Sequence, residues 1–257
     1  MGMRCKLCIL FAAFFVGGCA TVGSISDVPY YPSNPGAMLL KHTGDLQATA
    51  SASMGGETVT GAYALTSHTG LLASGSMSLH KSGDPNGNQY SGEMGFGVFD
   101  TAARWHTYTE VYGGLGWGAG NANINTYLGS SNFDFGWSSG RISGAENRNF
   151  WKGWLQGDAG YLSGNFSLMA ILRIEYVNLY HDVTSGIATT QYGFNDYTTG
   201  DTTYSTRGTL WGITPGLEAR YRFDRIQLLV ACFAAFVPGT NSEKFASSGA
   251  FGAGYLF

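Results

Sequence analysis

Charged side chains inside otherwise apolar segments are the residues of this chain that could do chemistry. They are Glu93, Glu110, Lys152, Asp158, Arg173, Glu175, Glu218, Arg220 and Arg222. Carboxylates next to basic groups could act as a catalytic acid–base set. They could also form ion pairs that fill a narrow interior. The second interpretation is favoured, and within it we expect Arg173 to lie near Asp158 or Glu218.

The segments that carry these charges alternate between apolar and small or polar residues with a period of two. That period is typical of β-strands, because successive side chains point to opposite faces. The alternation continues to Phe257, with Tyr255 and Phe251 on the same face. The candidate strands are 45–54, 57–66, 70–80, 89–100, 105–115, 149–162, 165–181, 205–222, 225–237 and 245–257.

The charged residues fall on one face of their strands, opposite the large apolar side chains. An Arg or Lys facing lipid at mid-depth costs about 2–4 kcal/mol. The pattern therefore predicts an all-β fold: a single antiparallel up-and-down transmembrane barrel of about ten strands, with eight as the alternative. Connections alternate between short turns and longer loops, which is typical of outer-membrane barrels.

Composition agrees with a wall that faces lipid. Charged residues make up 12% of the chain, Gly accounts for 39 of 257 residues, and aromatic residues for 14%. An ordinary globular domain has about 25% charged residues and about 7% Gly. The net charge of -3 argues against a nucleic-acid partner. No motif predicts a cofactor or a metal site.

The N-terminal residues predict a signal peptide over 1–18. Arg4 and Lys6 precede a short apolar run, which is too short to span a bilayer. The run ends in Val16-Gly17-Gly18-Cys19, which resembles the lipobox of bacterial lipoproteins. That resemblance implies cleavage before Cys19 and lipidation of Cys19. The alternative is an ordinary signal peptide cut near Gly18 or Ala20. Residues 19–44, which contain several prolines, are expected to be a lipidated N-terminus and linker, and 45–257 the barrel.

Residues 45–257 resemble the small outer-membrane β-barrel family, which includes the transmembrane domain of outer-membrane protein A. The resemblance lies in the alternation, the turn-like residues 64–68 and the terminal aromatic residue. It implies a bacterial outer-membrane location with outer-membrane lipids as partners. It also implies that the barrel-assembly machinery recognises Tyr255 and Phe257. We expect the lipid anchor on the periplasmic side.

The family spans many activities, so three functions stay open at this stage. The first is a non-enzymatic barrel with a structural or surface-interaction role, or a narrow solute passage, with charges in its lumen. For that function, the predicted loops 116–148 and 182–204 are candidate sites for an extracellular ligand. The second is a protease or lipid-modifying hydrolase at the extracellular rim, using His181 or His80. The third is a soluble periplasmic ligand-binding barrel, which would turn Phe251, Ile174 and Leu217 inward.

Overall fold

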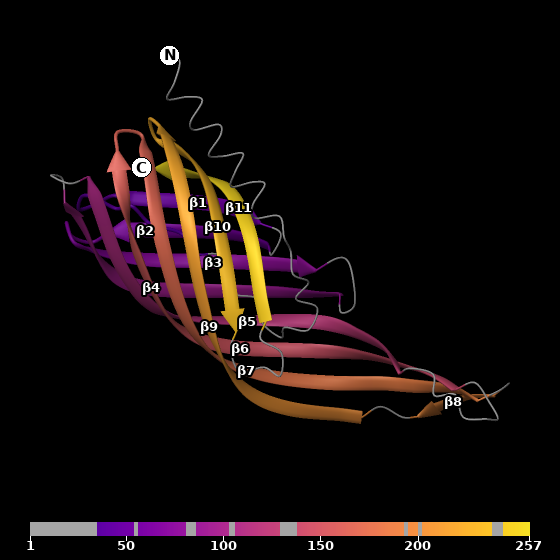
Figure 1. The fold of residues 1–257 in the computed structure, drawn as a ribbon. Helices are drawn as coiled ribbons and strands as arrows, with labels where there is room; N and C mark the ends of the chain where they lie inside the picture. The colour runs from indigo at the N-terminus through magenta and orange to yellow at the C-terminus, as the bar shows by residue number, and fades with distance from the viewer. Residues whose placement is uncertain are drawn as a thin grey trace, which may run out of the picture.

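The computed structural model describes residues 35–53, 56–80, 86–102, 106–128, 138–192, 195–199, 202–237 and 244–257. These residues form an all-β, closed antiparallel barrel of ten strands (Figure 1). The alternative of eight strands is therefore wrong. The elements are β1 (Leu46–Ser53), β2 (Gly56–Ala64), β3 (Thr69–His80), β4 (Asn86–Ala102), β5 (Thr107–Leu128), β6 (Ser138–Ser163), β7 (Phe166–Tyr192), β8 (Asn195–Thr199), β9 (Thr202–Phe223), β10 (Ile226–Val237) and β11 (Lys244–Leu256).

Each strand of the ring pairs with its neighbour along the chain, except that β9 follows β7. The ring closes where β1 pairs with β11, for example at Ala48 and Tyr255. The backbone N–H of Phe257 also donates to the carbonyl of Leu46 at 2.9 Å, so the last residue is held at the seam. The short β8 lies outside the ring and pairs with the far end of β7.

β5, β6 and β7 are much longer than the sequence predicts, and β4 and β9 are slightly longer. Residues 116–148 and 182–204 were expected to be loops, but most of their described residues extend β5, β6, β7 and β9. These extensions project past the ends of β1, β2 and β3 (Figure 1). Beyond the apolar band the residues are mainly Asn, Gly, Ser and Thr, which lack an apolar face for a pattern to detect. They form strands because the neighbouring strand continues to offer backbone hydrogen bonds.

Aromatic side chains on the outer surface form two girdles. Near the extensions, Trp117 lies opposite Trp151 in the ladder. The ring centroid of Tyr176 lies 5.8 Å from that of Trp151 and 5.0 Å from that of Trp211. The second girdle, near the short turns, contains the exposed residues Tyr63, Tyr161, Tyr221, Phe223, Tyr255 and Phe257. On β6, Tyr161 lies ten positions from Trp151. At about 3.3 Å per residue and a tilt of about 40°, ten residues rise about 25 Å, the height of a transmembrane barrel's apolar band.

The distribution of polar and apolar side chains is inverted relative to a water-soluble protein. Phe251 is 70% exposed, Leu115 is 67% exposed, and Leu217 is 44% exposed, whereas Lys152 and Glu175 are completely buried. Phe251, Ile174 and Leu217 all face outward, so the soluble ligand-binding alternative is wrong. Within the described part of the chain, no helix has the length and apolar character needed to cross a bilayer.

Candidate functional site: the barrel lumen

A segment that precedes β1 lies inside the barrel. Ala37, Met38 and Leu40 are 0–2% exposed. The backbone N–H of Met38 donates to Glu110 Oε1 on β5 at 2.6 Å. The carbonyl of Gly36 accepts from Gln156 on β6 at 3.0 Å, and that of Ala37 accepts from Arg220 on β9. We call residues 36–40 the lumen segment. The sequence analysis assigned these residues to a linker and missed their burial.

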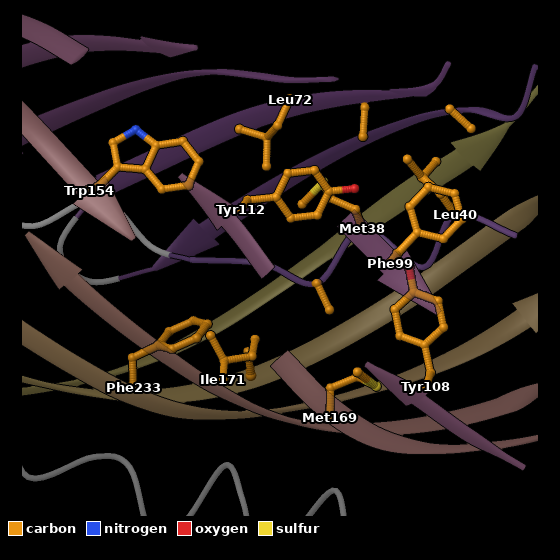
Figure 2. Packing of buried hydrophobic residues seen from close by; sticks show 14 of the residues in the cluster. Met38, Leu40, Leu72, Phe99, Tyr108, Tyr112, Trp154, Met169, Ile171 and Phe233 are labelled. Carbon is orange, nitrogen blue, oxygen red and sulfur yellow. The ribbon is translucent and has the colours of Figure 1, made fainter. Parts of the chain in front are cut away.

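Apolar side chains surround the lumen segment (Figure 2). Met38 and Leu40 pack in one buried cluster with side chains from several strands, among them Leu72, Phe99, Tyr108, Tyr112, Met169, Ile171 and Phe233. Gly70 on β3 makes room for this packing, because a Cβ there would lie 2.9 Å from Leu40 Cδ1 and 3.0 Å from the Tyr112 hydroxyl. Leu39 adopts a φ of 53° between the two buried residues. The lumen segment is therefore tightly enclosed.

Four charged residues form an ion-pair layer, which lies nearer the middle of the barrel than the apolar cluster around Leu40 does. We define this layer as Glu93 on β4, Lys152 on β6, and Arg173 and Glu175 on β7. Lys152 pairs with Glu93, and its Nζ lies 3.4 Å from Glu175 Oε1. Arg173 also pairs with Glu93, and its Nε donates to Glu175 Oε1 at 2.8 Å. The layer has two positive and two negative groups, so its formal charge is zero.

Local sequence explains why these four side chains can meet. Gly116 on β5 lies between Glu93 and Lys152 in the sheet, opposite both in register. A Cβ at Gly116 would lie 3.0 Å from both Glu93 Cγ and Lys152 Cε. On the other side, the Arg173 guanidinium lies 4.5 Å from the centroid of the Trp154 ring. Since a desolvated cation over an aromatic face is stabilised, Trp154 supports the position of Arg173.

A second polar cluster lies around the lumen segment. Arg220 Nε donates to Glu218 Oε1 at 2.6 Å, and Arg220 Nη1 donates to Gln227 Oε1 at 3.2 Å. Gln47 on β1, with its amide oriented to satisfy both of its atoms, joins the carbonyl of Met38 to Arg220. These contacts fix the lumen segment to the wall at β1 and β9.

Two buried carboxyl groups complete the polar interior on the opposite wall. Glu110 and Asp158 lie directly across from each other on β5 and β6. Besides the Met38 amide, Glu110 accepts a hydrogen bond from the Tyr108 hydroxyl at 2.8 Å. Asp158 accepts one from Gln156 at 2.8 Å. These hydrogen bonds, from one backbone donor and two side-chain donors, offset part of the cost of burying the two carboxyl groups.

Arg173 pairs differently from the sequence expectation. Its ion pairs join Glu93 and Glu175, whereas the sequence predicted Asp158 or Glu218. Glu218 pairs with Arg220, its neighbour on the same face of β9. Face assignment follows from the period of two, but partners across the lumen depend on the stagger of the closed barrel.

Arg222 lies outside both clusters, half-buried near the end of β9. Lys41, just past the lumen segment, lies near it. Burial lowers the pKa of Lys41 from its ordinary 10.5, the charge of Arg222 lowers it further, and Asp45 opposes the shift. The backbone amides of Lys41 and His42 both donate to Asp45 Oδ2 at 2.9 Å. A turn at Asp45 therefore fixes the point at which the chain leaves the lumen and continues toward β1.

The remaining predicted sites differ in what the structure shows of them. Tyr255 and Phe257 both face outward at the end of β11, with ring centroids 4.7 Å apart. Cys19 lies outside the described residues. The side chains of His80 and His181 also lie outside the described set. Among described residues, no group of three His, Cys, Asp or Glu side chains could hold a metal ion.

A small cavity borders the lumen segment. Its volume is about 10 Å³, and its lining includes Pro35, Gly36, Glu218, Arg220 and Phe233. A volume of that size is close to what a single water molecule occupies. The lumen beside the segment is therefore packed rather than open to a solute.

Comparison with known proteins gives only distant likenesses. No family model matches the chain, and no curated protein matches it. The translocator domain of autotransporter NalP from Neisseria meningitidis is 15% identical, with 84% of this chain and 90% of that chain covered and a TM-score of 0.29. The CymD monoaromatic hydrocarbon channel is 9% identical, with 84% and 88% covered and a TM-score of 0.31.

Proposed function

We propose that this chain is an integral outer-membrane β-barrel with a sealed lumen and a structural or surface-interaction role. The observation that carries the proposal is the filling of the interior. The lumen segment is hydrogen-bonded to β5, β6 and β9, and the ion-pair layer joins β4, β6 and β7. A filled interior favours a structural or surface-interaction role over the alternative of a narrow solute passage.

The surface-interaction role rests on the strand extensions. From Val177 to Tyr192, β7 continues for sixteen residues past the girdle at Tyr176. At about 3.3 Å per residue, this corresponds to about 53 Å of strand beyond the apolar band. The extensions of β5, β6, β7 and β9 adjoin one another through paired ladders, with one register shift between β6 and β7 at Ile142 and Ser143. A paired sheet of this length offers a broad surface for an extracellular ligand.

Tyr255 and Phe257 would serve as the recognition signal for the barrel-assembly machinery. Cys19 would be acylated and held in outer-membrane lipid. The protein would have no catalytic activity, because Glu93, Glu110 and Glu175 are already engaged by Met38, Tyr108, Arg173 and Lys152.

Planar-bilayer recording tests the sealed lumen. The full chain is refolded into lipid, and its folding is checked by heat-dependent gel mobility before fusion with the bilayer. We expect no steady conductance, because the lumen segment and the ion-pair layer both block the path. Stable, unitary conductance steps from folded protein would refute the sealed lumen and favour the solute passage.

A further inference from the structure

The strand extensions form a sheet with two borders, and the border on β9 is a long unpaired strand edge. On one side, β7 pairs with β9 along the whole of its extension. On the other side, β10 pairs with β9 only as far as Phe236 and Ile213. Among the residues that the structure describes, no strand pairs with β9 beyond Ile213 on that side, and β9 continues well past the end of β10 (Figure 1). We call residues 202–210, which lie beyond Trp211 of the girdle, the open edge.

The open edge presents backbone groups to whatever approaches it. In an antiparallel strand, the N–H and C=O groups of successive residues point alternately to the two sides. About half of the residues from Thr202 to Leu210 therefore direct both groups away from β7. At about 3.3 Å per residue, the open edge is about 30 Å long. Because a row of such groups is satisfied by another strand, the ligand chemistry that the edge recognises is an extended polypeptide.

The sequence of the open edge lacks the features that usually protect an exposed strand. Edges are commonly blunted by Lys, by Pro or by a short length. Residues 202–210 contain no Lys, Pro, Asp or Glu, and they contain four Thr and one Tyr, which favour strands. The opposite border, on β5, is shorter, because β4 pairs with β5 up to Asn123 and β5 ends at Leu128. The open edge on β9 is therefore the better template for an added strand.

We propose that the open edge binds an extended strand of a partner polypeptide, which adds to the sheet beside β9. The added strand would extend the ladder that β9 already makes with β10. Antiparallel pairing over the whole open edge would form about nine hydrogen bonds. In this binding mode, backbone pairing supplies affinity, and alternate side chains supply specificity. The inference rests on the surface-interaction role proposed above, for which it names the class of partner, and it does not depend on the sealed lumen.

A peptide copied from β7 is the probe for the open edge. Residues 177–185 pair with residues 202–210 on the other side of β9, so their sequence is compatible with this strand. The fluorescein-labelled peptide is titrated against the full chain refolded in lipid nanodiscs, and binding is measured by fluorescence anisotropy. Empty nanodiscs set the background. Two further peptides carry N-methyl groups on one edge each, at Asn178, Tyr180, Asp182 and Thr184 or at Leu179, His181, Val183 and Ser185.

We expect saturable binding of the unmodified peptide. Methylation of the edge that pairs should weaken binding by more than about tenfold, whereas methylation of the other edge should leave it unchanged. Equal binding of the two methylated peptides would indicate contact through side chains alone and would overturn the proposal. An absence of binding at millimolar peptide would overturn it as well. The sealed lumen would survive either result, because planar-bilayer recording tests it separately.

Proline substitutions locate the binding site. The N–H groups of Thr206 and Thr209 point to opposite sides of β9, so one of the variants Thr206→Pro and Thr209→Pro removes a donor from the open edge. Asn125→Pro, on the border at β5, is the matched control. We expect at least one β9 variant to weaken binding by more than about tenfold, and Asn125→Pro to bind like the parent. Parent-like binding by both β9 variants, or a loss confined to Asn125→Pro, would contradict the proposed site. Heat-dependent gel mobility confirms that each variant contains a folded barrel.

Discussion

Removal of Lys152 from the ion-pair layer should destabilise the barrel strongly. Lys152 is completely buried, and it pairs with Glu93 and Glu175, which are 2% and 0% exposed. In Lys152→Met, two buried carboxylates would share the single remaining cation, Arg173. Breaking a buried pair by removing one partner costs about 3–5 kcal/mol. We expect a loss of this size in the free energy of unfolding.

A second substitution should restore most of the loss. In Lys152→Met/Glu93→Gln the layer retains Arg173 and Glu175, so its formal charge returns to zero. Replacing a complete buried pair by residues of similar volume is often neutral or stabilising by about 1–4 kcal/mol. Glu57→Gln is the matched control, because Glu57 is exposed at the start of β2 and its substitution should change stability by less than about 0.5 kcal/mol.

The assay is urea unfolding in lipid vesicles, followed by tryptophan fluorescence, for the parent, Lys152→Met, Glu93→Gln, the double variant and Glu57→Gln. A double-mutant cycle then isolates the coupling between Lys152 and Glu93. If Lys152→Met unfolds within about 1 kcal/mol of the parent, as expected for solvent-screened pairs, the layer is hydrated. That result would refute the reasoning that the charges are held in a dry, packed interior.

Three further perturbations test other contacts. Leu40→Ala should cost about 2–5 kcal/mol by leaving a cavity in the lumen, measured as a shift in the urea midpoint. A Cβ at Gly97 would lie 2.3 Å from a carbonyl oxygen of the neighbouring strand, whereas one at Gly157 meets nothing within 4 Å. Gly97→Ala should therefore cost about 1–3 kcal/mol, and Gly157→Ala should unfold like the parent in the same titration. The lowered pKa of Lys41 means that the folded protein loses this proton before the unfolded chain does. The contribution of Lys41 to the free energy of unfolding should therefore rise as pH climbs toward 10.5, and Arg222→Gln should show a smaller rise than the parent in urea titrations at alkaline pH.

The wall of the barrel could be predicted from sequence because a period of two is a local property. Arg173 and Glu175 are two residues apart, so whichever face holds one also holds the other. The large apolar residues on the opposite face then decide which side meets lipid. The same logic places Glu218 with Arg220, and the structure pairs them directly.

The contents of the lumen could not be predicted, because they depend on residues far apart in the sequence. Met38 and Glu110 are separated by 72 positions, and Ala37 and Arg220 by 183. A segment rich in Pro and Gly has the composition of a linker, and its burial depends on the barrel that closes around it. Gly116 gives no signal on its own, although it allows Lys152 to reach Glu93.

The strand extensions escaped prediction for a different reason. Beyond Trp117 and Trp151, most residues of β5 and β6 are Asn, Gly, Ser, Thr or Ala, so no regular apolar alternation marks these segments as strands. Asn, Ser and Gly are common in loops and depleted in strands, so the propensities of these residues predict loops where the structure has strands. The continuous ladder between β5 and β6, which reaches Leu128 and Gly140, overrides that preference.

Quenching by brominated lipid measures most directly which side chains face the bilayer and which face a packed lumen. Trp151 and Trp154 lie three residues apart on β6, with 42% and 5% of their surfaces exposed. Two single-tryptophan variants, one retaining each residue, are refolded into vesicles of lipid brominated along its acyl chains. An inside-out barrel predicts strong quenching for Trp151 and little for Trp154. Equal quenching of the two, or stronger quenching of Trp154, would contradict it.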